Sequence, residues 1–118
     1  MDRFIKIQTD ILNWAESRGI LDQGTALGQA IKTQEEAQEL RDHVLMQSLG
    51  IDRFQDKKGE WQDVHEAIFD DIGDTLVTLI IQAEMQGFDI IDALESAYLI
   101  INERKGRMIN GQFVKDAE

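Results

Sequence analysis

Two short segments of the sequence place carboxylates at helical spacing. Both have the pattern acid-acid-x-x-acid, and they are Glu35–Glu39 and Asp70–Asp74. In an α-helix, positions i and i+3 lie about 60° apart around the axis and positions i and i+4 about 40° apart, so each segment presents its acids on one face. Two carboxylates about 5 Å apart repel each other by about 3 kcal/mol at an effective dielectric of 20. We call these two rows of carboxylates the acidic stripes. If the two acidic stripes lie close together in the fold, they therefore need a cation between them.

The residue types favour a hard divalent ion as that cation. The sequence contains no cysteine, and ligands that are carboxylates alone suit Mg²⁺, or Mn²⁺, better than zinc. Neither His43 nor His65 has a glutamate three residues before it, so the signature of a di-iron bundle is missing and both are taken as ordinary side chains. The alternative is that the acids are solvated helix faces. That alternative would suffice for one segment, but two segments with the same spacing favour a metal site.

Composition and charge narrow the class of protein. The 118 residues have 42% hydrophobic content, which predicts a single domain over residues 1–118. The net charge of −11 disfavours broad contact with a nucleic-acid backbone, so we expect no nucleic-acid partner. The sequence shows no basic-then-apolar leader and no apolar run near about 18 residues, which predicts a cytoplasmic protein without a membrane partner.

Apolar spacing predicts four helices that would position the acids. They cover approximately residues 4–17, 26–48, 61–86 and 89–104. The second would carry Glu35–Glu39, and the third would carry Asp70–Asp74. Residues 50–60 between them are polar and of mixed charge, which predicts a loop that is either a functional lid or simply mobile. The Asn-Gly pair at 110–111 lies between short apolar runs and predicts a small C-terminal hairpin.

The third and fourth predicted helices are apolar around more of their surface than one core face requires. The apolar residues are Leu76, Val77, Leu79, Ile80 and Ile81 in the third, and Ile90, Ile91, Leu94, Ala97, Tyr98, Leu99, Ile100 and Ile101 in the fourth. A monomer of this length has too little interior to bury them all. We therefore expect a homodimer or homotetramer. The alternative is an unusually central helix pair in a monomer.

These features together resemble a known family of all-α enzymes. The pattern covers about residues 32–107 and consists of Lys32-x-x-Glu35-Glu36-x-x-Glu39-Leu40, Asp71-x-Gly73-Asp74, Gly87-x-Asp89, Ala93-Leu94 and Asn102-x-x-Lys105. It is similar to the MazG-like nucleoside triphosphate pyrophosphohydrolases, whose relatives include dimeric dUTPases, dCTP pyrophosphatases and phosphoribosyl-ATP pyrophosphatase. The segment Lys105–Met108 with the following Asn-Gly pair looks most like phage or prophage members. The resemblance implies a four-helix, MazG-like bundle.

The resemblance also implies a metal site and a reaction. In the family, EExxE followed by ExxD binds Mg²⁺, so the implied ligands are Glu36, Glu39, Asp71 and Asp74, with Glu35 assisting. The pattern departs at Asp71, where the family has the longer glutamate. The implied reaction hydrolyses a nucleoside triphosphate to the monophosphate and pyrophosphate, with a metal-activated water attacking the α-phosphorus. Either Glu35 or Glu39 would accept the proton of that water.

Cationic, amide and aromatic side chains are candidates for holding the substrate. The candidates for contact with phosphate oxygens are Lys32, Asn102 and Lys105, with Arg104 as the competitor of Lys105. The candidates for stacking on the base are Trp14, Phe54 and Trp61. The alternative for each basic residue alone is a solvated helix end, and the alternative for Trp14 is a core position. For Lys105, only the family pattern favours contact with phosphate over a solvated helix end.

Two classes of function stay open at this level. The first is a magnesium-dependent nucleotide pyrophosphohydrolase. The second is a non-catalytic helical regulator of the same fold that binds nucleotide, metal or a protein partner. The complete set of acids favours the enzyme, and the shortened side chain at Asp71 keeps the second class open.

Overall fold

Helices account for most of the chain in the computed structural model, which describes residues 2–117. Within these residues lie five helices and two small antiparallel hairpins, one of them near the C-terminal end. The all-α prediction is thereby confirmed as a mostly helical fold. The chain divides into two compact units, Met1–Gly87 and Phe88–Glu118. The single domain expected over residues 1–118 stays a prediction.

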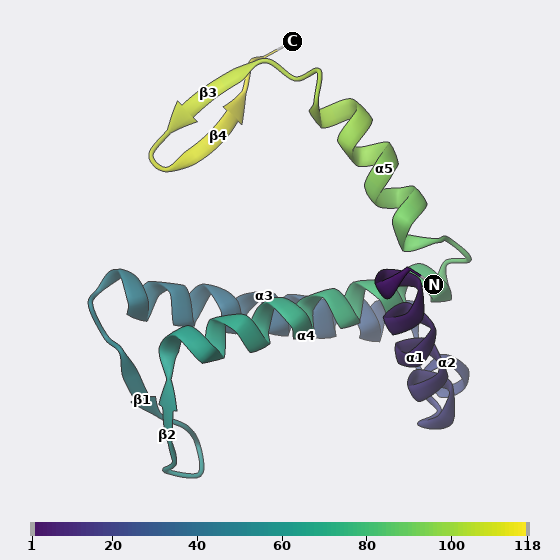
Figure 1. Cartoon of the computed structure of the whole chain (residues 1–118), viewed down its shortest axis with the longest axis horizontal. Helices are drawn as coiled ribbons and strands as arrows, with labels where there is room; N and C mark the ends of the chain where they lie inside the picture. The colour runs from purple at the N-terminus through teal and green to yellow at the C-terminus, as the bar shows by residue number, and fades with distance from the viewer. Residues whose placement is uncertain (1, 118) are drawn as a thin grey trace. The chain divides into compact units, whose positions relative to one another are not determined.

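The first unit is built on a pair of long antiparallel helices. Its elements are α1 (Arg3–Ser17), α2 (Ile20–Gln23), α3 (Ala26–Ser48), β1 (Arg53–Gln55), β2 (Trp61–Asp63) and α4 (Val64–Met85). Helices α3 and α4 lie side by side, and α1 runs across the pair and packs on α4 (Figure 1). The segment between α1 and α3 contains the one-turn helix α2. The two acidic segments lie on neighbouring helices, because Glu35–Glu39 is in α3 and Asp70–Asp74 is in α4.

Side-chain caps set the starts of the two long helices. Thr25 caps α3, because its Oγ1 accepts a hydrogen bond of 2.9 Å from the backbone N–H of Gly28. Asp63 caps α4, and its carboxylate accepts a bond of 2.9 Å from the N–H of Glu66. The predicted bounds of α3 are confirmed, whereas α4 begins at Val64 and not at Trp61.

A β-hairpin occupies the segment that was predicted to be an irregular loop. Strand β1 pairs with β2 in antiparallel register, with Phe54 opposite Gln62. The carboxylate of Asp56 holds the turn by accepting hydrogen bonds from the side chain of Gln62 and from the backbone N–H groups of Glu60 and Lys58. These bonds, with that from Gln62 the largest contributor, lower the pKa of Asp56. The loop prediction for residues 50–60 is therefore wrong at Arg53–Gln55, which form β1, and the helix prediction is wrong at Trp61–Asp63, which form β2. The rest of residues 50–60 contains neither helix nor strand, as predicted.

Polar side chains cross the α3–α4 interface beside the apolar core. The buried apolar residues of this unit are Ala15, Val64, Ile80, Ile81 and Ala83. The buried amide of Gln29 donates a 3.1 Å hydrogen bond to the carbonyl of Thr78. The hydroxyl of Thr33 donates a 2.8 Å bond to Oγ1 of Thr78. These bonds fix one register of α3 against α4, because sliding one helix would leave buried polar groups unpaired.

The second unit consists of one helix and one hairpin. Helix α5 (Ile90–Ile101) begins after Asp89, whose carboxylate accepts a 2.7 Å hydrogen bond from the N–H of Ile91. Strands β3 (Gly106–Ile109) and β4 (Gln112–Lys115) pair in antiparallel register. Asn110 and Gly111 between them have φ angles of 49° and 79°, and two positive values are what a type I′ turn requires. The predicted C-terminal hairpin is confirmed.

Large apolar side chains stay exposed on this chain. On α4 they are Phe69, Ile72, Leu76 and Leu79, and on α5 they are Leu94, Tyr98, Leu99, Ile100 and Ile101. Helix α5 has no buried residue. Among the helices of residues 2–117, none combines the length and apolar character that crossing a membrane requires.

Candidate functional site

The acids of α3 and α4 are buried to different degrees. The side chain of Glu36 is 13% exposed, whereas that of its neighbour Glu35 is 59% exposed. On α4, Asp71 is buried, whereas Asp70 and Asp74 are exposed as whole residues. Each stripe therefore turns one carboxylate toward the helix–helix interface and leaves the others near solvent.

The charges of α3 and α4 act on one another at Asp74. Although Asp74 is exposed as a whole residue, partial loss of water around its carboxylate raises the pKa of Asp74 above its usual value, and repulsion from Glu36, Asp70 and Asp71 raises the pKa further. The positive charge of Lys32 opposes this shift. Glu36 is on α3 and Asp74 is on α4, so the two acidic stripes are close enough to repel each other.

Lys32 supplies a cation beside these acids. Its Nζ atom lies 3.5 Å from Oε1 of Glu36 and 3.6 Å from Oε2 of Glu35. Attraction to Glu36 is the main cause that raises the pKa of Lys32, against a smaller opposing effect of burial. The lysine side chain is 57% exposed, so these ion pairs contribute little to stability. The ammonium group is therefore easily drawn away to another anion.

A pocket collects residues that the sequence assigns to both metal and substrate. Lys32, Glu36, Asp74 and Trp14 line a cavity of about 170 Å³, together with Ile20, Gln29, Val77, Thr78 and Ile81. Three helices contribute to it, because Trp14 is on α1, the pair Lys32 and Glu36 is on α3, and Asp74 is on α4. The indole is 46% exposed, so it forms an open aromatic wall beside the charged groups.

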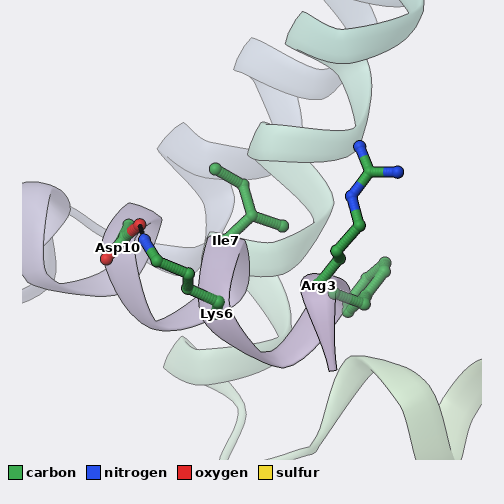
Figure 2. A pocket seen from close by; sticks show the side chains of 5 residues that line it. Arg3, Lys6, Ile7 and Asp10 are labelled. Atoms are coloured by element: carbon green, nitrogen blue, oxygen red, sulfur yellow. Dashed lines mark hydrogen bonds and ion pairs between the residues drawn. The ribbon is translucent and has the colours of Figure 1, made fainter. Parts of the chain in front are cut away.

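Two further pockets adjoin helix α1. An apolar trough of about 740 Å³ lies between α1 and α4, and its lining includes Phe4, Ile7, Phe69 and, at one side, Asp74. Another pocket of about 530 Å³ lies on α1 itself, where the side chains of Lys6 and Asp10 form a 2.9 Å ion pair (Figure 2). This second pocket contains none of the predicted site residues.

The structure brings together only part of the predicted set. Glu39 is exposed on α3. Asn102 and Lys105 belong to the second unit. There Lys105 lines a pocket of about 440 Å³ together with Lys115 of β4 and other residues of the same unit. Within residues 2–117, no three carboxylate or imidazole groups are arranged to hold a metal ion as the side chains stand.

A histidine that sequence reasoning treated as ordinary contacts one of the acids. The Nδ1 atom of His43 lies 2.6 Å from Oδ2 of Asp71. His43 follows Glu36 by seven residues, which is close to two full turns, so both residues lie on the same face of α3. That spacing is the signal that would have assigned His43 to the acid face.

Comparison with protein-family models, with curated proteins and with solved structures gives no match to this chain.

Proposed function

We propose that this chain is a magnesium-dependent nucleoside triphosphate pyrophosphohydrolase with a MazG-like helical bundle. The supporting observation is the pocket that Lys32, Glu36, Asp74 and Trp14 share. Carboxylates for a metal ion, a mobile cation for phosphate and an aromatic face for a base all open into it. A metal–nucleotide complex needs these three kinds of group within one site.

The donor types suit a hard divalent cation, and within residues 2–117 binding would have to bring three of them together. All of its ligands are carboxylate oxygens, which suits Mg²⁺, and Mn²⁺ as a substitute. Glu36 and Asp74 would hold the ion, with Asp71 and Glu39 as the other ligands that the family pattern implies. Glu36, Asp70 and Asp71 repel the negative charge of Asp74. Such an ion would neutralise this excess negative charge. When bound, the ion supplies charge neutralisation for the triphosphate and an activated water.

The other side chains of the proposed site bind and orient the substrate. Lys32 exchanges its carboxylate partners for phosphate oxygens, because its own side chain is 57% exposed and solvent weakens its ion pairs. Trp14 stacks on the base. Glu35, 59% exposed and directly before a metal ligand, accepts the proton from the attacking water, with Glu39 as the alternative base. The role of Asn102 and Lys105 at the phosphates stays a prediction from the sequence.

We propose a homodimer or homotetramer as the working assembly. The apolar side chains exposed on α4 and α5 include Phe69 at 79% and Leu99 at 69%. Association between subunits would bury such surface.

One observation favours the non-catalytic regulator as a second candidate. Among the described residues no group of three ligands is preformed, and one oxygen of Asp71 is engaged by His43. A protein that binds nucleotide through Lys32 and Trp14 without hydrolysing it would tolerate this arrangement.

The test is a panel of canonical and modified nucleoside triphosphates, assayed for pyrophosphate with and without Mg²⁺. The proposal expects magnesium-dependent release from at least one member, and loss of that release in Asp74→Asn. Glu84→Gln is the matched control, because Glu84 is an exposed acid on α4 outside the pocket. Nucleotide binding without any pyrophosphate would favour the regulator, and equal activity of both variants would exclude Asp74 as a ligand.

A further inference from the structure

Asn110 and Gly111 form the tip of the second hairpin, between β3 and β4 (Figure 1). Both residues are exposed. A side-chain carbon placed on Gly111 would meet no atom of the described residues within 4 Å, apart from those of its chain neighbours. The tip is therefore open to water on all sides, and no neighbouring element holds it in place.

This pair of residues has the chemistry for spontaneous loss of the side-chain amide. The backbone nitrogen of Gly111 attacks Cγ of Asn110, and the bond from Cγ to the amide nitrogen breaks. The proton of the backbone nitrogen leaves with that amide as ammonia, and a five-membered succinimide ring remains. Water then opens the ring at either carbonyl, which gives aspartate or isoaspartate. Glycine hinders the attacking nitrogen less than any other residue, because it has no Cβ.

The stability of the hairpin controls how often the attack can occur. The attack needs a rotation of the Asn110 backbone that a closed type I′ turn restricts, so the reaction proceeds from the opened hairpin. Each strand has four residues, all of them exposed. A two-stranded hairpin without buried side chains is only marginally stable in water. Local opening therefore exposes this turn to reaction more often than it exposes the helices.

The other two asparagines of the sequence lack these features. Asn13 lies inside α1 and precedes Trp14, whose side chain hinders attack by its own nitrogen. Asn102 ends α5 and precedes Glu103. Its backbone N–H donates a 2.8 Å hydrogen bond to the carbonyl of Tyr98, which restricts the backbone at this position. Sequence and structure thus both select Asn110.

We propose that Asn110 is a spontaneous deamidation site and that its isoaspartate product opens the second hairpin. Isoaspartate adds a methylene group to the main chain, so the two-residue turn can no longer keep the geometry that pairs Met108 with Phe113. The end of β4 would also be released, because the Asp116 N–H now donates a 2.8 Å bond to the carbonyl of Lys105. This inference concerns the second unit alone and does not depend on the proposed activity.

The first measurement is the rate of deamidation at each asparagine of the full chain. The protein is incubated at mildly alkaline pH, and peptide mass spectrometry locates the modified residues, with an isoaspartyl methyltransferase assay for isoaspartate. Asn110 should react at least about tenfold faster than Asn13 and Asn102, and denaturing urea should speed its reaction by less than about tenfold. Isoaspartate should be present in the product.

The second measurement is hydrogen exchange of the backbone amides in β3 and β4. The isoaspartate fraction of the incubated parent should lose the protection that the fresh parent shows. Freshly prepared Asn110→Asp should keep that protection, because aspartate also suits the first position of this turn. Asn110→Gln is the matched control for incubation, since its longer side chain disfavours ring closure. It should exchange equally before and after the same treatment.

Four results would overturn the inference. Equal rates at the three asparagines would show that the turn is not selected. Aspartate without isoaspartate would mean direct hydrolysis and not ring formation. Acceleration by urea well beyond about tenfold would show that the closed turn protects Asn110. Exchange of β3 and β4 that is the same in the fresh parent and in its isoaspartate fraction would refute the opening of the hairpin.

Discussion

The two units of the chain differ in how far their apolar residues are buried. In the first unit, Ile80 and Ile81 of α4 are 4% and 3% exposed, packed beside the polar bonds that cross to α3. In the second unit, Leu94 and Leu99 of α5 are 63% and 69% exposed, although α5 is the more apolar helix by sequence. The first unit thus has a core of its own, and the second has an apolar surface without one.

We expect this difference to correspond to separate tasks of the two units. The acid cluster and its pocket lie within the first unit, on helices whose register is fixed by Gln29, Thr33 and Thr78. The apolar helix of the second unit is what a subunit interface requires. We therefore expect substitutions in the first unit to change chemistry and substitutions on α5 to change assembly.

The largest effect on activity is expected at Asp71, which lies in the unit that contains the acid cluster. Asp71→Asn should lower pyrophosphate release by orders of magnitude, because a ligand charge is lost. Asp71→Glu restores the residue of the resembling family and should retain activity if residue 71 contacts the metal. Steady-state assays at saturating Mg²⁺ measure both variants. An active Asp71→Asn enzyme would remove this residue from the ligand set.

A second test addresses assembly through α5. Leu94→Glu combined with Leu99→Glu should shift the protein to a 13.5 kDa monomer in light scattering, because buried unpaired charges oppose association. Leu27→Glu is the control, since Leu27 is 72% exposed on α3, and it should leave the mass unchanged. A parent protein that is already a monomer at micromolar concentration would contradict the expected assembly through α5.

A smaller effect concerns pH. The pKa of Asp74 is raised in the folded state, chiefly by burial and then by Glu36. The native state therefore holds this proton to higher pH than the unfolded state, and stability falls as pH rises from the usual 3.8 through the raised pKa. Urea unfolding without metal should show Asp74→Asn gaining stability relative to the parent across that window. A constant difference at all pH values would contradict the shift.

The smallest effect is expected at the polar contacts between α3 and α4. Thr78→Val should lower the free energy of unfolding by about 1 kcal/mol, because the hydroxyl that accepts from Thr33 is lost. Thr9→Val on α1 is the control, since its hydroxyl bonds only the exposed carbonyl of Ile5. Chemical denaturation distinguishes the two. Equal effects would mean that the buried contact does not fix the register.

Local signals in the sequence were sufficient for the long helices and the closing turn. The periodic apolar residues predicted α3, and the Asn-Gly pair predicted the second hairpin. The first hairpin was missed because its strands are three residues each, too short for a period of two to show. Its turn depends on Asp56, whose bonds to Glu60 and Gln62 become visible only in three dimensions.

The candidate site was predictable where it follows one helix and not where it crosses between helices. The spacing of Glu35–Glu39 and Asp70–Asp74 placed each stripe on a face, and the structure brings Glu36 near Asp74. The pairing of His43 with Asp71 depends on the register of α3 against α4. That register is set by buried polar contacts, which no pattern within a single helix encodes.

The central claim is that the acids of α3 and α4 form a cation site at the cost of mutual repulsion. The most direct measurement is the free energy of unfolding of the parent and of Glu36→Gln, each with and without Mg²⁺. Without the ion, Glu36→Gln should be as stable as the parent or more stable, because repulsion at Asp74 is relieved. With the ion, the parent should gain stability and the variant should gain much less. A variant that is less stable without Mg²⁺, or an equal gain in both proteins, would contradict the account.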